Sequence, residues 1–84
     1  MQDRIDPQLV ARAQAGDRAA LDAVVAGSYA KVYRLGLRLC RNQADAEDLT
    51  QETFVRAVSS LPSYRGDAAF ETWLWSIALN VARS

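Results

Sequence analysis

Four of the ten carboxylates of this sequence lie between residues 45 and 52, close enough together that they could take part in chemistry. Paired carboxylates can act as a general acid and base, or they can bind a metal ion. Both roles usually need further groups. The 84-residue chain has no histidine and one cysteine, and its four glycines stand alone rather than in a phosphate-binding loop. We therefore predict no catalytic residues, no metal site and no cofactor, and we do not expect an enzyme.

Three of these acidic side chains share one face of a predicted helix at about 100° per residue. The face consists of Asp45, Asp48, Gln51 and Glu52, with Val55 among them. The helix dipole favours acids near a helix N-terminus, which accounts for Asp45 and Asp48 but not for the residues further along. A polar patch that includes an apolar residue is typical of a protein contact surface. A solvated face and a protein-binding face both stay open at this point.

A second charged pattern is cationic. Lys31, Arg34, Arg38 and Arg41 are spaced three, four and three residues apart, and no acidic residue interrupts them. They lie opposite a predicted apolar side that consists of Val32, Tyr33, Leu35, Gly36, Leu39 and Cys40. The pattern indicates either a solvated helix face or a stripe that faces phosphates or acidic groups.

The last predicted helix carries aromatic residues on both sides. Its core stripe is predicted to be Phe70, Trp73, Leu74, Ile77 and Val81, and its opposite side Thr72, Trp75, Ser76, Leu79 and Arg83, with Asn80 at the boundary. The preceding loop adds Ser63, Tyr64 and Arg65. Rings beside amides, hydroxyls and cations suit unpaired bases, which stack and present hydrogen-bonding edges. The alternative is that Trp75 packs under the first helix or against another copy, and that Tyr64 only folds over the loop.

These residues are positioned by helices. Capping residues and apolar spacing predict helices over about 7–15, 18–41, 44–61 and 69–83, with a loop at 62–67 and a bend or break at 27–28. We predict an all-α fold in which about four helices surround one core. The absence of a signal sequence or a long apolar stretch predicts a cytoplasmic domain without membrane insertion. Zero net charge argues against coating nucleic acid by bulk electrostatics.

Three segments carry a resemblance to a known family. DAEDLTQETFVRA (45–57), YRGDAAFETWL (64–74) and IALNVAR (77–83) occur in order with ordinary spacing. Together they resemble domain 2 (region 2) of the extracytoplasmic-function (ECF) sigma factors, and the match extends over nearly all of residues 1–84. The family's second domain, which binds the −35 element, is not expected within this chain.

The resemblance implies two partners. Domain 2 docks on the β′ clamp helices, a coiled coil of the RNA polymerase core, and the matching residues here are Asp48, Gln51 and Glu52. It also recognises and melts the promoter −10 element and captures an unstacked non-template base in the loop before the last helix. Here the matching base contacts are Ser63, Tyr64 and Arg65.

Further DNA contacts are implied along the last helix. Asn80 matches a contact at the upstream edge of the −10 element, Arg83 a neighbouring backbone contact, and Trp73 an aromatic position near the point of strand separation. Ser76 departs from the Arg or Lys that relatives often carry, which places the backbone contact there in doubt. The resemblance also implies an anti-sigma factor as a partner. A competing hypothesis is a sigma-like decoy that binds an anti-sigma factor and does not contact DNA.

Overall fold

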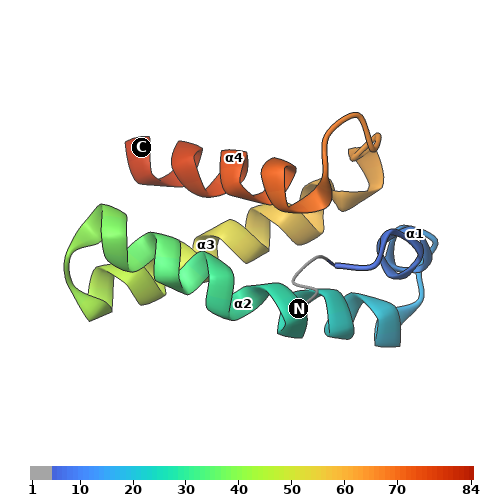
Figure 1. The fold of residues 1–84 in the computed structure, drawn as a ribbon, viewed down its shortest axis with the longest axis horizontal. Helices are drawn as coiled ribbons and strands as arrows, with labels where there is room; N and C mark the ends of the chain where they lie inside the picture. The colour runs from blue at the N-terminus through green and yellow to red at the C-terminus, as the bar shows by residue number, and fades with distance from the viewer. Residues whose placement is uncertain (1–4) are drawn as a thin grey trace.

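The computed structural model describes residues 5–84, and these residues form helices joined by short turns (Figure 1). In chain order the elements are α1 (Pro7–Gln14), α2 (Arg18–Cys40), α3 (Gln43–Ser60), the 3-10 turn η1 (Leu61–Ser63) and α4 (Phe70–Arg83). The described part of the chain contains no strand. The predicted all-α fold is therefore confirmed, and residues 27–28 lie within an uninterrupted α2.

Side-chain caps start the first three helices where the sequence predicts them. Asp6 accepts the Gln8 N–H at 2.9 Å, and Asp17 accepts the Ala20 N–H at 3.1 Å. Asn42 begins α3 in the same way, because its Oδ1 accepts the Asp45 N–H at 2.8 Å. Each cap satisfies a backbone donor that has no partner within the helix.

Several helix bounds differ from the prediction by one residue: α1 ends at Gln14, α3 begins at Gln43 and α4 begins at Phe70, and the ends of α2 and α3 differ as well. α2 ends at Cys40, because Arg41 adopts a left-handed backbone conformation with φ of 67°. α3 ends at Ser60, and the next three residues tighten into η1 with Pro62 inside it. Proline has no N–H to continue the α-helical hydrogen bonds. The chain therefore turns toward the loop that leads into α4.

The core lies where α2 packs against α3. The buried residues of α2 recur at every fourth position and are mostly small: Ala20, Val24, Ser28, Val32 and Gly36. At Gly36 the helices are so close that an added Cβ would lie 3.3 Å from both the Ala46 oxygen and the Leu49 Cδ2 atom. The prediction that Leu39 belongs to this apolar side is wrong, since it is 42% exposed. Cys40 continues the four-residue repeat and is half-buried, so Leu39 falls outside it.

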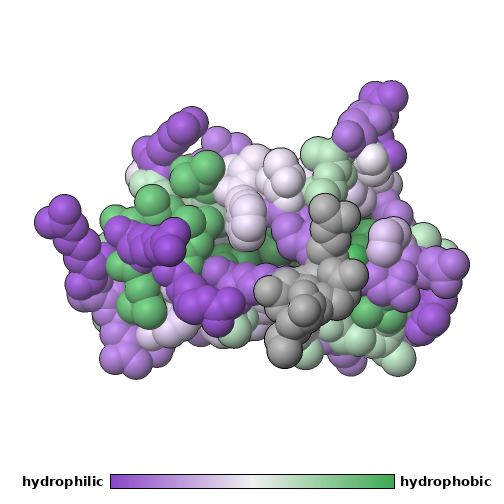
Figure 2. Space-filling view, viewed as in Figure 1, coloured by the Kyte–Doolittle hydropathy of each residue, from purple (hydrophilic) through white to green (hydrophobic). Residues whose placement is uncertain are grey.

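α4 lies across α3 and α2 and closes the core (Figure 1). Phe70 and Leu74 are buried as predicted, and Ala78 is buried as well. Trp73, Ile77 and Val81 pack against this core while staying half-buried. Within residues 5–84, no helix is long and apolar enough to cross a membrane. Figure 2 shows the face on which α2 and α4 lie side by side, with hydrophilic side chains over α2 next to pale and hydrophobic ones over α4.

Candidate nucleic-acid and protein interfaces

The loop between η1 and α4 is held in shape by contacts at both of its sides. The Gln14 side chain on α1 donates hydrogen bonds to the Leu61 oxygen at 3.1 Å and to the Tyr64 oxygen at 2.7 Å. The Tyr64 hydroxyl donates to the Ala68 oxygen at 2.5 Å, which ties one end of the loop to the other. The loop is therefore preformed rather than free to adopt many shapes.

Aromatic packing sets the position of Tyr64. Its ring lies with centroids 5.0 Å from Trp73 and 5.9 Å from Phe70, and the contact with Phe70 is edge-to-face. Phe70 and Trp73 are themselves 5.6 Å apart. The Tyr64 ring therefore packs over the loop, and its role as a base contact stays a prediction. The predicted inward placement of Trp73 is confirmed by its half-buried position.

Partial burial, together with the nearby carboxylates of Glu71 and then Asp67, raises the pKa of the Tyr64 phenol above its ordinary value. Burial disfavours the charged phenolate, and the two acidic groups repel it. The phenol is therefore protonated throughout the physiological range. It remains a hydrogen-bond donor, which is the role that it has toward the Ala68 oxygen.

A hollow of about 390 Å³ opens beside this loop and the first turns of α4. Its lining joins the loop residues Ser63, Tyr64, Arg65, Asp67 and Ala68 to the α4 residues Thr72, Trp73 and Ser76. Arg65 is exposed, and its Nε lies 3.8 Å from an Asp67 carboxylate oxygen. Such an exposed pair is easily separated, so the guanidinium is available to a ligand. The Ser76 hydroxyl donates to the Trp73 oxygen at 2.6 Å.

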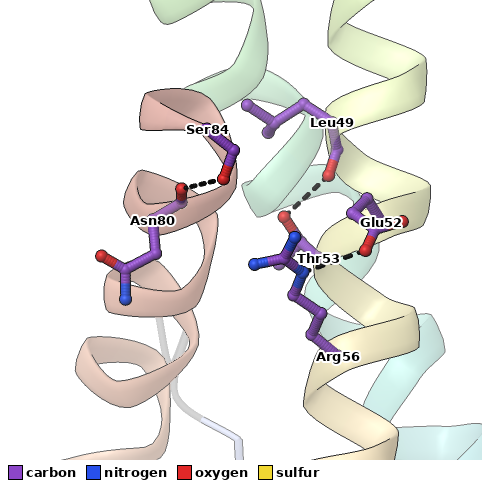
Figure 3. Close-up of polar contacts among 6 residues, drawn as sticks. All are labelled: Leu49, Glu52, Thr53, Arg56, Asn80 and Ser84. Atoms are coloured by element: carbon purple, nitrogen blue, oxygen red, sulfur yellow. Dashed lines mark hydrogen bonds and ion pairs between the residues drawn. The ribbon is translucent and has the colours of Figure 1, made fainter.

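The outward face of α4 is exposed along its length. As the periodicity predicts, Thr72, Trp75, Ser76, Leu79 and Arg83 lie on it, and Asn80, which was predicted at the boundary, is exposed as well. Figure 3 shows the Asn80 amide extending away from α3, while the Ser84 hydroxyl donates to the Asn80 backbone oxygen at 3.0 Å. Trp75 is 43% exposed and lies beside α2, not under α1. The structure therefore brings Ser63, Tyr64, Arg65 and Trp73 together at one end of α4 and places Asn80 and Arg83 toward the other.

The acidic face predicted on α3 is present. Asp48, Gln51 and Glu52 are exposed, and Val55 among them is 64% exposed. Glu52 is partly neutralised, because one of its carboxylate oxygens lies 2.9 Å from the Arg56 Nε one turn later (Figure 3). Asp45 is engaged by the Asn42 amide at 2.9 Å. The Asp48 carboxylate has no hydrogen bond or ion pair with any side chain or backbone group of residues 5–84, so its charge is the most available on this face.

Two polar residues that join distant parts of the chain, one of them at the loop, were not found from the sequence. Gln14 is a polar residue on a short helix, and nothing in its neighbours predicts that it reaches across to residues 61 and 64. Glu71 is the other, since its carboxylate accepts the Ile5 N–H at 2.6 Å and joins the start of the described chain to α4. Among the described residues, no cluster of three or more potential metal ligands occurs.

These features define an all-α module with an acidic helix face and, on the neighbouring helix, an aromatic and polar face that ends in a preformed loop. A family model described as sigma-70 region 2 matches residues 24–84. The chain belongs to the sigma-70 region 2 family.

Similar proteins agree with this assignment. The chain is 42% identical over 79 residues to the RNA polymerase sigma-H factor of Pseudomonas aeruginosa and to the ECF RNA polymerase sigma-E factor of Escherichia coli. These matches take in 94% of this chain but only 41% of the length of each relative. The NMR structure of an engineered region 2 of sigmaE in complex with GTAAAA matches with a TM-score of 0.82 and 35% identity, over 99% of this chain and 83% of that one. The resemblance to ECF region 2 is thereby confirmed.

Proposed function

We propose that this chain recognises and melts the promoter −10 element and binds the RNA polymerase core, as region 2 of an ECF sigma factor in transcription initiation. The observation that carries the proposal is the hollow beside the preformed loop, lined by Ser63, Tyr64, Arg65 and Trp73. Its position at the end of an exposed helix face lets one surface meet both an extracted base and the DNA beside it. The sigmaE region 2 that this fold matches was solved with GTAAAA, which supports a DNA role.

The loop is suited to capturing a base because its shape is set before binding. Extracting a base from a duplex costs a few kcal/mol, and stacking on a ring returns about 1–3 kcal/mol per base. A flexible loop would add the cost of becoming ordered. The hydrogen bonds from Gln14 and from the Tyr64 hydroxyl remove much of that cost. Arg65, held only by a weak exposed pair, can swing to a base edge or phosphate.

The length of α4 supports a second contact with the same DNA. Phe70 and Asn80 are ten residues apart, a rise of about 15 Å along an α-helix. Stacked nucleotides in a duplex strand are spaced about 3.4 Å apart, so this distance corresponds to roughly four of them. Asn80 and Arg83 would therefore touch the upstream edge of the −10 element while the loop holds a base further downstream.

The polymerase contact is assigned to Asp48, Gln51 and Glu52 on α3. A domain with zero net charge lacks the phosphate contacts needed to hold duplex DNA tightly by itself. A protein partner that docks basic side chains on this acidic face would bring the α4 face to the promoter. We assign the β′ clamp helices to this place, and residues 1–84 to a single region 2 domain.

A second domain of the factor and an anti-sigma factor belong to the proposal only at the level of the family. Part of the relatives' length lies outside the match, and the complete factor would add a −35-binding domain. An anti-sigma factor would hold the protein inactive in the cytoplasm.

The test is binding of a single-stranded −10 oligonucleotide in the presence of polymerase core. We expect Arg65→Ala to weaken binding about tenfold, and an abasic site at the captured position to weaken the wild type by a similar factor. Arg18→Ala is a matched control, because Arg18 is an exposed arginine far from the loop in sequence, and within residues 5–84 its ion-pair partner is Asp22. Equal and poor binding by wild type and Arg65→Ala, together with tight binding of an anti-sigma factor, would overturn the DNA role in favour of the decoy.

A further inference from the structure

The chain enters α1 over two other helices and is attached to both. The Ile5 N–H donates to a Glu71 carboxylate oxygen at 2.6 Å, which joins the start of the described chain to the first turn of α4. The half-buried Ile5 side chain lies against α2 at Gly27, because a Cβ atom added to that glycine would be 3.0 Å from the Ile5 Cδ1 atom. Gly27 lies inside an uninterrupted helix, where glycine is less favourable than every residue except proline. Its lack of a side chain leaves room for Ile5.

Residues 5–14, which we call the strap, meet the loop between η1 and α4 at both of its ends. At the first end the Gln14 amide donates to the Leu61 and Tyr64 oxygens at 3.1 and 2.7 Å. At the second end Ile5 is bonded to Glu71, one residue after α4 begins. A hollow of about 830 Å³ lies between these two points, lined by residues of the strap and of the loop. Figure 1 shows α1 at the end of the molecule where the chain turns into α4. The strap is therefore attached on both sides of the loop.

We propose that the strap positions the loop for base capture, and that Ile5, Gly27 and Glu71 are positioning residues that fix its free end. The assignment rests on the proposed function, since that function gives the loop its task. α4 starts after Ala69, whose methyl group cannot cap the helix, so the first turn of α4 is tied to the strap through Glu71 instead. The path of the chain before α1 thereby sets where the loop ends and α4 begins.

Stiffness within the strap carries the position of Ile5 to Gln14. Asp6 caps α1, and Pro7 fixes the backbone angle of its first residue, so Ile5 is held in a set relation to the helix that carries Gln14. When Ile5 is released, α1 shifts, and the two hydrogen bonds from Gln14 to the loop weaken. Base binding then includes the cost of ordering the loop.

The first test adds a side chain at position 27 and needs no DNA. Gly27→Leu takes the place of the Ile5 side chain and gives α2 a better helix former, so the strap is displaced without a fall in the urea midpoint. Hydrogen exchange of the free protein is followed by NMR. We expect the Ile5 amide to exchange at least about tenfold faster, because it loses a bond to a charged acceptor, and the Gln14 side-chain amide to exchange several-fold faster. Ala26→Leu, the same side chain at the neighbouring exposed position, should change neither.

The second test measures base capture itself. Affinities for a single-stranded −10 oligonucleotide and for its abasic counterpart are compared in the presence of polymerase core, and the wild type should prefer the intact strand about tenfold. Glu71→Ala should lower this preference to about threefold while leaving binding of the abasic strand unchanged. Glu71→Gln removes the same charge but keeps an oxygen that can accept the Ile5 N–H, so it should retain most of the preference. A general loss of stability would weaken binding of both strands alike.

The two tests separate failure of the strap from failure of the proposed function. An Ile5 amide that stays protected in Gly27→Leu, or a Gln14 amide that stays protected after Ile5 is released, would overturn the strap. So would an unchanged preference for the intact strand in Glu71→Ala, or an equal loss of it in Glu71→Ala and Glu71→Gln. A wild type that binds intact and abasic strands equally would contradict the proposed function instead. Exchange of the Gln14 amide in Gly27→Leu then still decides whether the strap positions the loop.

Discussion

The outward faces of α3 and α4 are neighbours in the fold but are built in different ways. The α3 face consists of charges that a single helix brings together, and Asp48 and Glu52 are one turn apart on it. The α4 face is mostly uncharged and ends at a loop whose shape depends on Gln14 from α1 and on the Trp73 ring. A charged face acts over several ångströms and can attract a partner. A loop hollow acts only by contact, so it must be held in shape.

The largest expected effect comes from a substitution that changes the α3 face and leaves the α4 face intact. Asp48→Arg reverses the most available charge on it, and like charges brought together at an interface cost several kcal/mol. We expect polymerase-core binding to fall at least about 30-fold, as measured by a pull-down or by fluorescence titration with core. Glu47→Arg makes the same charge change on another side of α3 and should leave binding nearly intact. Equal loss in both variants would show that only net charge matters.

A smaller effect is expected from a substitution that changes the α4 face and leaves the α3 face intact. Asn80→Asp keeps the size of the side chain but replaces its amide donors with a negative charge beside DNA. A bidentate amide contact to a base is worth about 1–3 kcal/mol, so binding of a −10 duplex in the presence of core should fall about tenfold. Core binding without DNA should not change, because the Asn80 amide points away from α3 (Figure 3). A loss of core binding in this variant would contradict the separation of the two faces.

The third prediction concerns the start of α3. Asn42→Ala removes the side chain that caps the Asp45 N–H and also holds the Asp45 carboxylate. Loss of such a cap lowers the free energy of unfolding by about 1 kcal/mol. Urea denaturation measures this change, and Gln43→Ala, at an exposed neighbouring position, is the control. An unchanged urea midpoint would mean that α3 is held by packing and not by its cap.

The smallest predicted effect is on the ionisation of the Tyr64 phenol in the loop. Because the folded protein raises the pKa of Tyr64, folding favours the neutral phenol. The resulting stabilisation is fully present below the ordinary tyrosine pKa of about 10 and is lost as the pH rises through the raised value. An absorbance titration of the wild type minus that of Tyr64→Phe isolates this phenol. Ionisation of Tyr64 at or below its ordinary pKa would contradict the packed position of its ring.

Much of the helical framework could be predicted because its signals are local. Capped helices α1 and α2 begin at the predicted residues and α3 one residue earlier, and the spacing of apolar residues separates the two sides of α4 correctly. Leu39 was misplaced because the buried stripe of α2 repeats strictly every four residues, and that repeat is set by close packing against α3. Periodicity alone does not reveal how near the second helix lies.

The resemblance to ECF region 2 selected Ser63, Tyr64, Arg65, Trp73, Asn80 and Arg83 as DNA contacts. The structure places them along α4 and its loop, and their role as contacts stays a prediction. The sequence did not reveal that Tyr64 packs on Trp73 and Phe70. Nor did it reveal that Gln14 holds the loop by hydrogen bonds to residues 47 and 50 positions further along the chain. Contacts between such distant residues depend on how the helices pack, and no local pattern encodes them.

The sequence by itself determined the helices, the two charged stripes and the family, because capping, helical period and motif spacing act between residues a few positions apart. The tertiary structure alone decided the shape of the loop and brought the α2 cations and Trp75 to the same groove between α2 and α4. Both depend on helices that meet across the core, where the small residues of α2 let α3 approach closely. The zero net charge of the chain is therefore a sum over separate faces, and the fold decides what each of them meets.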